Sequence, residues 1–432
     1  MSAYAEFLAR KTRVAEPAGH QVALADINLA LHDWQRRIVQ WAVGVGRAAI
    51  WADTGLGKTR MELEWARLSG KVTLIVAPLA VCQQTVREAA AIGMDARYIR
   101  DGIDITGPGV WITNYEMVDH FDPNILDAVV LDEASILKQS DGKTRTKLIE
   151  HFAGVARRLA CTATPAPNDS EELTNQAEFL GVTTRRDMLA TYFVHDNNGW
   201  RPKGHARNAM YRWMAEWAVA LRRPSDLGYP DNGYILPKLD IVPHLLPVEV
   251  TVDGQLFGAD LGGVGGRAKV RKATLEPRCE HAASLVVAEP DQPWLLWCGT
   301  NDEADMLARL IPDALNIYGS MSPEEKAAGL LGFADGTVKH LITKPKIASF
   351  GMNFQHCARI AFVGLSDSWE QYYQGIRRCW RYGQTRPVHA HIVLTETEAP
   401  IAANIARKES EANAINESLI AEMRKSTTWS TR

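Results

Sequence analysis

Short apolar runs alternate with helix-like segments over about the first 180 residues. The strand-like runs cover residues 48–51, 72–77, 110–113, 128–131 and 158–161. Helix-like stretches lie between several of them, such as residues 59–68 and 81–91. Short apolar strands that alternate with helices are typical of a parallel sheet covered by helices on both faces. The first part of the chain is therefore predicted to be an α/β domain.

A second series of the same kind follows toward the C-terminus. Its predicted strands are residues 293–298, 314–318, 340–343, 360–363 and 389–394, and its predicted helices are residues 303–310, 323–334, 369–380 and 399–423. The intervening residues 185–247 are rich in Trp, Arg, Pro and Gly, with one convincing helix pattern over residues 206–221. The glycine-rich residues 254–266 are interpreted as a flexible connector.

These patterns predict four parts of the chain. We expect an N-terminal extension (1–30), a first α/β domain (31–184), a basic irregular segment with a linker (185–250) and a second α/β domain (251–432). The length of 432 residues suits such a division, and 46% hydrophobic with 23% charged residues is ordinary for a globular protein.

Cysteine usage and apolar run lengths narrow the class of protein. The six cysteines are scattered and form no CxxC pair, which argues against a structural zinc site and against a disulfide framework. No apolar run reaches about 18 residues, so no membrane span is expected. The N-terminus has no signal-peptide character. We expect a cytoplasmic protein that is monomeric in solution.

Charge is unevenly distributed, although the net charge is only −3. Residues 185–223 hold eight basic and three acidic residues, and residues 254–278 hold five basic and two acidic residues. Phosphate contacts in a groove and a solvated surface are both consistent with such stretches. Trp200, beside Arg201 and Lys203, is the better tryptophan candidate for ligand contact, whereas Trp213 and Trp217 have the spacing of core residues on one helix.

Residues 52–59 read ADTGLGKT, follow a predicted strand and open a predicted helix. Small residues in such a loop let backbone N–H groups approach phosphates, and a helix N-terminus favours negative charge. Lys58 is expected to contact the β- and γ-phosphates of ATP, and the Thr59 hydroxyl to bind Mg²⁺. The residues expected to hold the nucleotide here are Asp53, Thr54, Gly55, Leu56, Gly57, Lys58 and Thr59.

Two carboxylates, Asp132 and Glu133, end the apolar residues 129–131. Ligands of parallel sheets gather at the carboxyl ends of strands. Asp132 is therefore expected to hold Mg²⁺ largely through water, and Glu133 to orient or deprotonate the attacking water. The next run ends in CTATP, where the hydroxyls of Thr162 and Thr164 would hydrogen-bond the acidic pair. A simple strand-to-turn transition is the alternative there.

Residues 369–386 read WEQYYQGIRRCWRYGQTR. The spacing of Gln374, Arg378 and Arg381 places them on one face of the predicted helix. Four arginines and no acid follow Gln374, a crowding that is costly unless an anion docks there. An arginine that reaches the γ-phosphate would stabilise the charge that develops during hydrolysis. Nucleic-acid phosphate is the alternative anion, and a solvated helix is the alternative without a ligand.

The order of these motifs resembles superfamily 2 helicases, most closely the Swi/Snf-type double-stranded DNA translocases in a compact phage or bacterial form. The resemblance covers roughly residues 31–394. LHDWQ (31–35) is similar to the Q motif, which implies that Gln35 reads adenine. ADTGLGKT is similar to motif I, LDEAS (131–135) to motif II and CTATPAPND (161–169) to motif III. The resemblance implies two RecA-like P-loop domains that use ATP and Mg²⁺.

The chain also resembles further motifs of this family, of which motifs Ia and Ib imply contacts to the nucleic-acid backbone. IVAPLAV (75–81) and ITNYE (112–116) resemble motifs Ia and Ib, LLWCGT (295–300) motif IV, SFGMNFQHC (349–357) motif V and QGIRRCWRYGQ (374–384) motif VI. In motif V, Gly351 and Asn353 are expected at the nucleotide. ALRRPSDLGY (220–229) and LPKLDIVPHLL (236–246) resemble the arginine-pair segment before the second lobe. The expected nucleic-acid contacts are Pro78, Thr113, Asn114, Thr162, Thr164, Arg201, Lys203, Arg222 and Arg223.

The chain departs from the family pattern at Ser135, where His or Asp is commonest, and at Ala163, where Gly is usual. The long insertions of chromatin remodellers are absent, so nucleosome remodelling is not implied. The expected function is an ATP-dependent motor that translocates on duplex or branched DNA, with RNA not excluded. An RNA helicase and an ATP-switched nucleic-acid clamp without movement are the alternatives. No structural metal is expected, and the sequence does not disclose protein partners.

Overall fold

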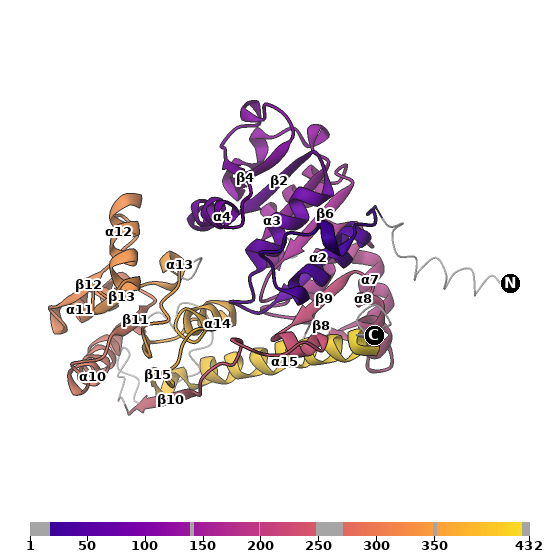
Figure 1. The fold of residues 1–432 in the computed structure, drawn as a ribbon. Coiled ribbons are helices and arrows are strands. Elements are labelled where there is room, and N and C mark those ends of the chain that lie inside the picture. The colour runs from indigo at the N-terminus through magenta and orange to yellow at the C-terminus, as the bar shows by residue number, and fades with distance from the viewer. Residues whose placement is uncertain (1–17, 139–141, 198, 248–270, 349–351, 426–432) are drawn as a thin grey trace. The chain divides into compact units, whose positions relative to one another are not determined.

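The computed structural model describes residues 18–138, 142–197, 199–247, 271–348 and 352–425 (Figure 1). Packing divides the chain into two compact units: unit 1 is Met1–Asp231 with Ser410–Arg432, and unit 2 is Asn232–Glu409. Each unit is built on its own parallel sheet. The predicted fold class of two parallel-sheet α/β domains is therefore confirmed. The packing boundary at Asp231 differs from the predicted limits at residues 184 and 250.

Unit 1 is built on a seven-stranded sheet in the order β3-β4-β2-β5-β6-β1-β9, and all its strand pairs are parallel. Five of these strands were predicted. The strands are β1 (Arg47–Ala52), β2 (Val72–Ala77), β3 (Ala96–Tyr98), β4 (Gly109–Asn114), β5 (Ala128–Asp132), β6 (Arg157–Cys161) and β9 (Ala218–Leu221). Apart from β3, where Arg97 is exposed, the side chains of these strands are mostly buried, as expected for a parallel sheet covered on both faces.

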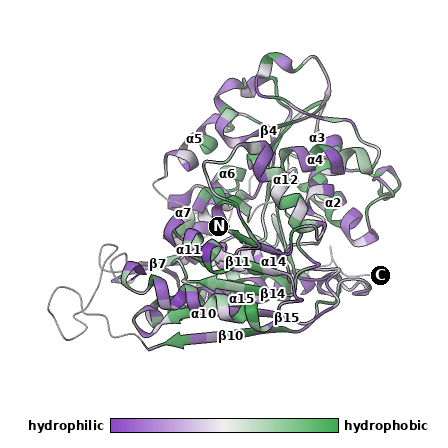
Figure 2. Ribbon diagram, turned by 90° about the vertical axis from the view of Figure 1, so that its left-hand side faces the viewer, coloured by the Kyte–Doolittle hydropathy of each residue, from purple (hydrophilic) through white to green (hydrophobic). Residues whose placement is uncertain are grey.

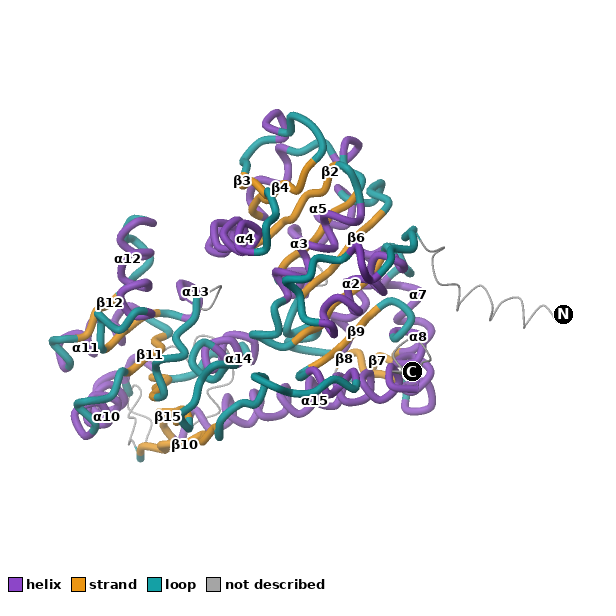
Figure 3. Tube along the Cα trace, viewed as in Figure 1, coloured by secondary structure: helices purple, strands orange, loops and turns teal. Residues whose placement is uncertain are grey.

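Helices connect these strands and pack on the sheet, as α3 does beside β2, β4 and β6 (Figure 3). The helices of this unit are α2 (Asp33–Val45), α3 (Lys58–Ser69), α4 (Leu79–Ala91), α5 (Lys143–His151), α6 (Leu173–Leu180), α7 (Arg185–Tyr192) and α8 (Arg207–Met214). Helix α2 ends at Gly46, whose φ of 74° lies in the left-handed region. A side chain at Gly46 would also meet the backbone of Gly19 at 2.3 Å, so the turn into β1 requires glycine.

The middle of the chain is more regular than predicted. The single helix expected over residues 206–221 is wrong in its second half, where α8 ends and the strand β9 begins. The four apolar residues of β9 pair with β1 and are buried, so sheet pairing overrides the helical pattern. A hairpin of β7 (Phe193–Asp196) and β8 (Gly199–Pro202) also lies in this segment. Trp217 is fully buried against Trp213, as predicted for core residues.

Unit 2 is built on a six-stranded parallel sheet in the order β10-β15-β14-β11-β13-β12. The strands are β10 (Leu239–Leu246), β11 (Trp294–Cys298), β12 (Ala314–Asn316), β13 (His340–Thr343), β14 (Arg359–Val363) and β15 (Val388–Thr395). Strand β10 was not predicted as a strand. It lies at the sheet edge, where its alternating exposure and the imino acid Pro243 are tolerated.

Three helices described in unit 2 lie at predicted positions, α11 (Asn301–Leu310), α12 (Pro323–Ala334) and α14 (Trp369–Arg377). Two further helices, α10 (Leu275–Ala288) and α13 (Pro345–Ala348), were not predicted. Helix α14 ends at Arg377, although the pattern predicted residues 369–380, so Arg381 lies in the turn that follows it. The buried apolar residues of β14 belong to the hydrophobic core of this unit. The hydropathy of each residue along the ribbon is shown in Figure 2.

The last helix, α15 (Ala399–Lys425), begins in unit 2, and its residues from Ser410 onward pack with unit 1. Leu419 and Met423 are buried there, and the backbone N–H of Ala220 in β9 donates to the Met423 sulfur at 3.2 Å. The edge of the first sheet is thus covered by the helix, which protects an otherwise unpaired strand edge.

Three features of the described residues concern membrane spans, cysteines and metal ligands. No helix there is both long and apolar enough to span a membrane. All six cysteines are buried and free. Within the same ranges, no cluster of three or more His, Cys, Asp or Glu side chains has an arrangement that holds a metal ion.

Candidate functional site

The predicted phosphate-binding loop, residues 52–59, joins β1 to α3 and has two glycines in left-handed conformations. Gly55 has φ 87°, and Gly57, which caps α3, has φ 71°. A Cβ on Gly57 would lie 2.4 Å from the Gln35 amide nitrogen, so the loop is closely packed as well as sharply turned. The Lys58 ammonium lies over the loop and donates to the Ala52 carbonyl oxygen at 2.8 Å. The loop therefore presents its lysine and the N-terminus of α3 at one place.

Gln35 supports this loop from α2. It is 2% exposed, its amide nitrogen donates to the Leu56 carbonyl oxygen at 2.9 Å, and its amide oxygen accepts from the His32 backbone N–H at 2.9 Å. Both polar ends of the side chain are thus engaged in holding the loop and the start of α2. That Gln35 reads adenine stays a prediction.

The acidic pair lies where β5 ends. Asp132 is 7% exposed; burial raises the pKa of its carboxyl, while the charge of Lys58 and the Glu133 backbone N–H oppose that shift. Glu133 has φ 55° and is the one non-glycine residue with positive φ in the described ranges. Such a conformation costs about 1–3 kcal/mol and persists where the surroundings enforce it. Strain of this kind is concentrated at functional sites.

Residues that directly follow two other strands of the sheet contact this strained turn. The Thr162 hydroxyl, just after β6, lies 3.5 Å from a Glu133 carboxylate oxygen. The Tyr115 hydroxyl, just after β4, donates to the Asp132 carbonyl oxygen at 2.6 Å. The contact of Thr162 with the acidic pair was expected from the sequence, and the contact of Tyr115 was not.

Glu62 is a further buried carboxyl that the sequence reading missed. It lies on α3 one turn after Lys58 and is completely buried. Burial, together with the negative charge of Asp132, raises the pKa of Glu62 well above its usual value. Its only sequence signal is the i+4 spacing from Lys58, which places it on the sheet-facing side of α3.

The donor set suits magnesium bound together with phosphates. Mg²⁺ in nucleotide sites keeps several waters and takes one or two protein ligands besides phosphate oxygens. Thr59 in the first turn of α3 and Asp132 at the end of β5 supply a hydroxyl and a carboxylate oxygen of the kind that this requirement asks for. The roles of Thr59 and Asp132 as ligands stay predictions.

Several predicted nucleic-acid contacts in unit 1 are buried. The side chains of Thr113, Thr162 and Thr164 have no exposed surface, so their hydroxyls are out of reach of a surface ligand in this conformation. Asn114 is 3% exposed and accepts from the Tyr98 hydroxyl at 2.7 Å. Pro78 is the N-cap residue of α4 and is half-buried.

The predicted basic contacts already have protein partners. Arg201 pairs with Asp196 across the β7–β8 hairpin at 2.5 Å. The Lys203 ammonium donates to the Ala190 carbonyl oxygen at 2.8 Å. Arg222 bonds Asn413 and Glu417 of α15, and Arg223 lies 3.8 Å from Asp231. A nucleic-acid role for these four residues stays a prediction and requires exchange of these partners.

In unit 2, Arg378 and Arg381 converge on one atom. Their guanidinium groups donate to the Met352 carbonyl oxygen at 2.9 and 3.2 Å. Gln374 is 1% exposed, and its amide has no hydrogen-bond partner among the described residues. Buried polar groups are normally paired, so an orphaned amide beside two arginines is typical of a functional position. Asn353 is exposed, and Gly351 lies outside the described residues.

The remaining arginines of this segment have structural partners. Arg377 is buried between the Trp380 and Tyr373 rings, with its guanidinium carbon 4.6 Å from the Trp380 centroid. Burial lowers the pKa of Arg377 to about 10. Arg386 donates to Gln292 and to the His356 carbonyl oxygen. Of the four arginines that follow Gln374, Arg377 and Arg386 therefore have structural partners, which leaves the pair Arg378 and Arg381.

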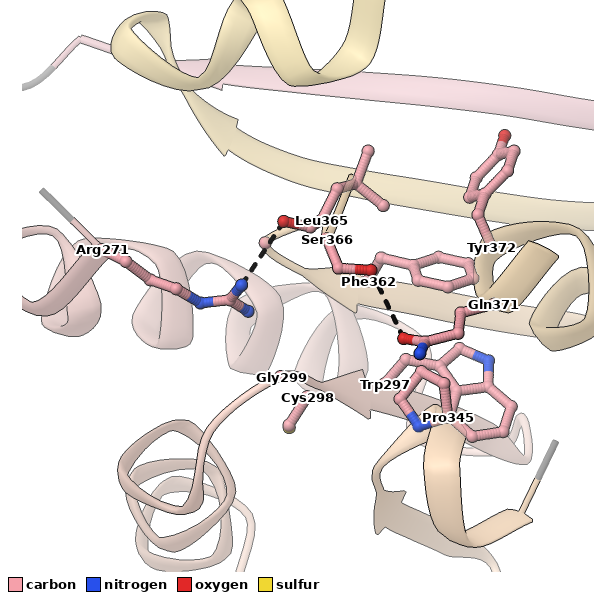
Figure 4. Close-up of a pocket in the computed structure, with 11 residues that line it drawn as sticks. Arg271, Trp297, Cys298, Gly299, Pro345, Phe362, Leu365, Ser366, Gln371 and Tyr372 are labelled. Atoms are coloured by element: carbon pink, nitrogen blue, oxygen red, sulfur yellow. Dashed lines mark hydrogen bonds between the residues drawn. The ribbon is translucent and has the colours of Figure 1, made fainter. Parts of the chain in front are cut away.

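A small pocket lies at the carboxyl ends of β11 and β14 (Figure 4). Arg271, Gly299, Ser366 and Gln371 are among its lining residues, and the Arg271 guanidinium donates to the Leu365 carbonyl oxygen at 3.3 Å. Arg271 also forms two short contacts with Glu303. The cavity of about 30 Å³ holds water molecules at most, so it is no nucleotide site as it stands.

Comparisons with known proteins agree with the motifs. Residues 278–383 match the family described as helicase conserved C-terminal domain. The chain is 30% identical over 431 residues to "Putative protein p41" of Acyrthosiphon pisum secondary endosymbiont phage 1, with 84% of this chain and 92% of the relative covered. A solved structure, the Sulfolobus solfataricus SWI2/SNF2 ATPase core in complex with dsDNA, is similar with a TM-score of 0.44 and 17% identity, covering 94% of this chain and 98% of that one.

The matched C-terminal helicase domain contains the residues of α14 and the arginine pair that follows it. The phosphate loop and the strained acidic pair lie on the other parallel-sheet unit. The match to the phage protein covers 84% of this chain and therefore includes residues of both units. Residues 278–383 therefore form a helicase conserved C-terminal domain, and the chain belongs to the same family as the phage protein.

Proposed function

We propose that this chain is a motor that couples ATP hydrolysis to translocation on duplex or branched DNA. The observation that supports hydrolysis most directly is Glu133, a carboxylate in a strained conformation beside Asp132 and Thr162. A protein that only bound nucleotide would have no need of a carboxylate aimed by a strained turn. Two sequence features support DNA as the nucleic acid on which the motor moves: the GLGKT form of the loop, and Gly383 followed by Gln384. Both support it by analogy with the DNA-dependent members of the family.

In the proposed mechanism, the first unit supplies the phosphate cradle and the base. The N–H groups of residues 53–59 bind the phosphates, and Lys58 exchanges the Ala52 carbonyl oxygen for a phosphate oxygen. Glu133 accepts a proton from the attacking water, and Thr162 holds its carboxylate in place. Mg²⁺, when bound by Thr59 and Asp132, would neutralise phosphate charge.

We assign to Arg378 and Arg381 the stabilisation of charge on the γ-phosphate. Both already lie against one carbonyl oxygen, which sets their guanidinium groups side by side. Two cations held together favour an anion between them, and arginines in that role act mainly in the transition state. Gln374, with its unpaired buried amide, would contribute a hydrogen bond to the same group.

The nucleic acid on which the motor moves is identified by comparing the rates of ATP hydrolysis with different nucleic acids. The rate is measured alone and then with single-stranded DNA, duplex DNA, branched DNA and RNA at matched nucleotide concentration and two salt concentrations. Stimulation by duplex or branched DNA is the expected result, and it should weaken at the higher salt concentration. Stimulation by RNA alone would instead identify an RNA helicase.

Movement is tested separately from hydrolysis. Displacement of a triplex-forming strand from duplex DNA is measured with ATP, and the Lys58→Ala variant is the control that binds but does not turn over. ATP-dependent displacement is expected from the wild type alone. Hydrolysis stimulated by DNA without any displacement would show a nucleic-acid clamp switched by ATP.

A further inference from the structure

Tyr115 is a buried tyrosine whose hydroxyl reaches motif II from two strands away. It is the first residue of a short 3-10 turn, Tyr115–His120, that follows β4, and it is 8% exposed. Its hydroxyl donates to the Asp132 carbonyl oxygen at 2.6 Å. In the sheet, β2 lies between β4 and β5, so this contact passes over the end of β2. The bond is therefore long-range in sequence and specific in geometry.

The register explains how the tyrosine crosses that strand. Ala77, the last residue of β2, is paired with Asn114, and Val76 is paired with Leu131. The ends of β4, β2 and β5 are therefore level, and the middle strand ends there in the small residue Ala77. Tyr115 follows directly after this level, where its ring has room to reach the end of β5.

The accepting carbonyl belongs to the peptide that links Asp132 to Glu133. Rotation of that peptide sets the φ of Glu133, which is 55° and unfavourable for a residue with a side chain. A hydrogen bond to the carbonyl oxygen resists that rotation. Thr162 contacts the Glu133 carboxylate itself, at 3.5 Å, so the backbone and the side chain of Glu133 are held from different strands.

We propose that Tyr115 is a positioning residue for ATP hydrolysis, whose hydroxyl holds the Asp132–Glu133 peptide so that Glu133 stays aimed for catalysis. The proposal rests on the proposed function of Glu133 as the group that activates water. It gives the backbone of motif II a role in hydrolysis. It also gives a role to Tyr115, which does not contact the reacting atoms.

The test removes only the hydroxyl. Tyr115→Phe keeps the buried ring and should lower kcat for ATP about tenfold, with the KM for ATP and the thermal midpoint nearly unchanged, because binding groups remain in place. The matched control is Tyr98→Phe, which removes another tyrosine hydroxyl bond, to Asn114 at 2.7 Å, on the neighbouring strand β3. Without nucleic acid, Tyr98→Phe should leave kcat within about twofold.

A double-mutant cycle identifies the group through which Tyr115 acts. If the tyrosine acts by aiming Glu133, then Tyr115→Phe should lower the single-turnover rate of the wild type and not that of Glu133→Gln. Two independent, multiplying effects would overturn the proposal, and so would an unchanged kcat in folded Tyr115→Phe. Should the variant be too unstable to assay, Ala77→Val, which narrows the path over β2 while the hydroxyl is kept, must lower kcat without a change in KM.

The proposed function and this inference fail in different ways. A wild-type chain with no ATP hydrolysis under any nucleic-acid condition would remove both. A wild type that hydrolyses ATP, together with a fully active and folded Tyr115→Phe, would remove the role of Tyr115 alone.

Discussion

Glu172, Arg278 and Glu303 are charged side chains that lie in the interior of the protein. Arg278 and Glu303 are fully buried and paired at 2.9 Å, and Arg271 joins the same carboxylate. Although burial opposes its charge, the pKa of Glu303 is lowered because Arg271 and Arg278 surround it. Such pairs need both members, since loss of one leaves an uncompensated buried charge. Glu172 differs, because its partners are the neutral amide groups of Asn168.

Glu172 should make the stability of unit 1 depend on pH. Burial raises its pKa from 4.5 to about 7, although hydrogen bonds from Asn168 oppose the shift. Because the folded pKa is raised, the stabilisation is complete below about pH 4.5 and is lost as pH rises through about 7. A shift of this size corresponds to about 3 kcal/mol at most.

The measurement is urea unfolding of wild type and Glu172→Gln between pH 5 and pH 8. The neutral variant should become more stable than the wild type by up to about 3 kcal/mol as pH rises. Glu150→Gln, at an exposed position on α5, serves as the control and should follow the wild type. Parallel curves for Glu172→Gln and wild type would show that Glu172 is ionised throughout.

Lys58 provides the sharpest test of the phosphate loop. Lys58→Ala removes the one side-chain cation of the loop and should lower ATP turnover at least about a hundredfold, because phosphate charge is no longer neutralised. Phosphate release is measured at saturating ATP. Lys71→Ala, an exposed lysine just beyond α3, is the control and should retain the wild-type rate. Similar turnover in both variants would refute the assignment of residues 52–59.

At the scale of elements, α15 and β9 show how a distant segment completes a sheet. The helix buries Leu419 and places the Met423 sulfur against Ala220 of the edge strand, and Arg222 bonds both Asn413 and Glu417 on the helix. Strand β9 has only four residues, and an exposed sheet edge invites pairing with another chain. The C-terminal turns of α15 are thus part of the fold of unit 1.

Shortening the Leu419 side chain tests how much the packing of α15 contributes to the stability of unit 1. Leu419 has no exposed surface, so Leu419→Ala should lower the free energy of unfolding of unit 1 by about 2–5 kcal/mol through lost burial and a cavity. Denaturant unfolding followed by tryptophan fluorescence measures the change, because Trp217 lies next to β9. Ser418→Ala, half-exposed on the same helix, should change stability by less than about 0.5 kcal/mol. Equal, small effects would mean that the helix end contributes little.

At the scale of the whole molecule, the residues assigned to hydrolysis are divided between two units. Lys58, Asp132 and Glu133 belong to unit 1, and Gln374, Arg378 and Arg381 belong to unit 2. Because of this division, a substitution in one unit can lower the rate of ATP hydrolysis without lowering the affinity for ATP. It also gives ATP a means to favour one conformation of the molecule, provided that ATP contacts differ between conformations.

Arg381→Ala tests the division. ATP affinity should stay within about threefold of the wild type, because the phosphate loop is intact, while kcat falls about a hundredfold with the lost transition-state contact. A fluorescent ATP analogue measures binding, and phosphate release measures kcat. Arg386→Ala, whose partners are Gln292 and His356, is the control. Normal hydrolysis by Arg381→Ala would show that the arginine pair serves another anion.

Much of the fold and of the candidate site could be read from contiguous patterns. The apolar runs of β1, β2, β4, β5 and β6 and the loop at residues 52–59 depend on neighbours in the chain, so local sequence determines them. The acidic pair at Asp132 is similar, since it directly ends an apolar strand. The role of each arginine after Gln374 could not be predicted from the sequence. It depends on aromatic rings and carbonyl oxygens that approach the arginine only in the folded chain.

The sequence by itself therefore determined two α/β units, the loop between β1 and α3 at residues 52–59, and the acidic pair at the end of β5. Tertiary structure decided that β9 and β10 are strands, that Arg377 stacks while Arg378 and Arg381 share the Met352 carbonyl oxygen, and that Glu62 is buried below Lys58. It also decided that Tyr115 holds motif II across a strand. The physical reason is that sheet pairing, burial and long-range hydrogen bonds join residues far apart in sequence, and no local pattern records their partners.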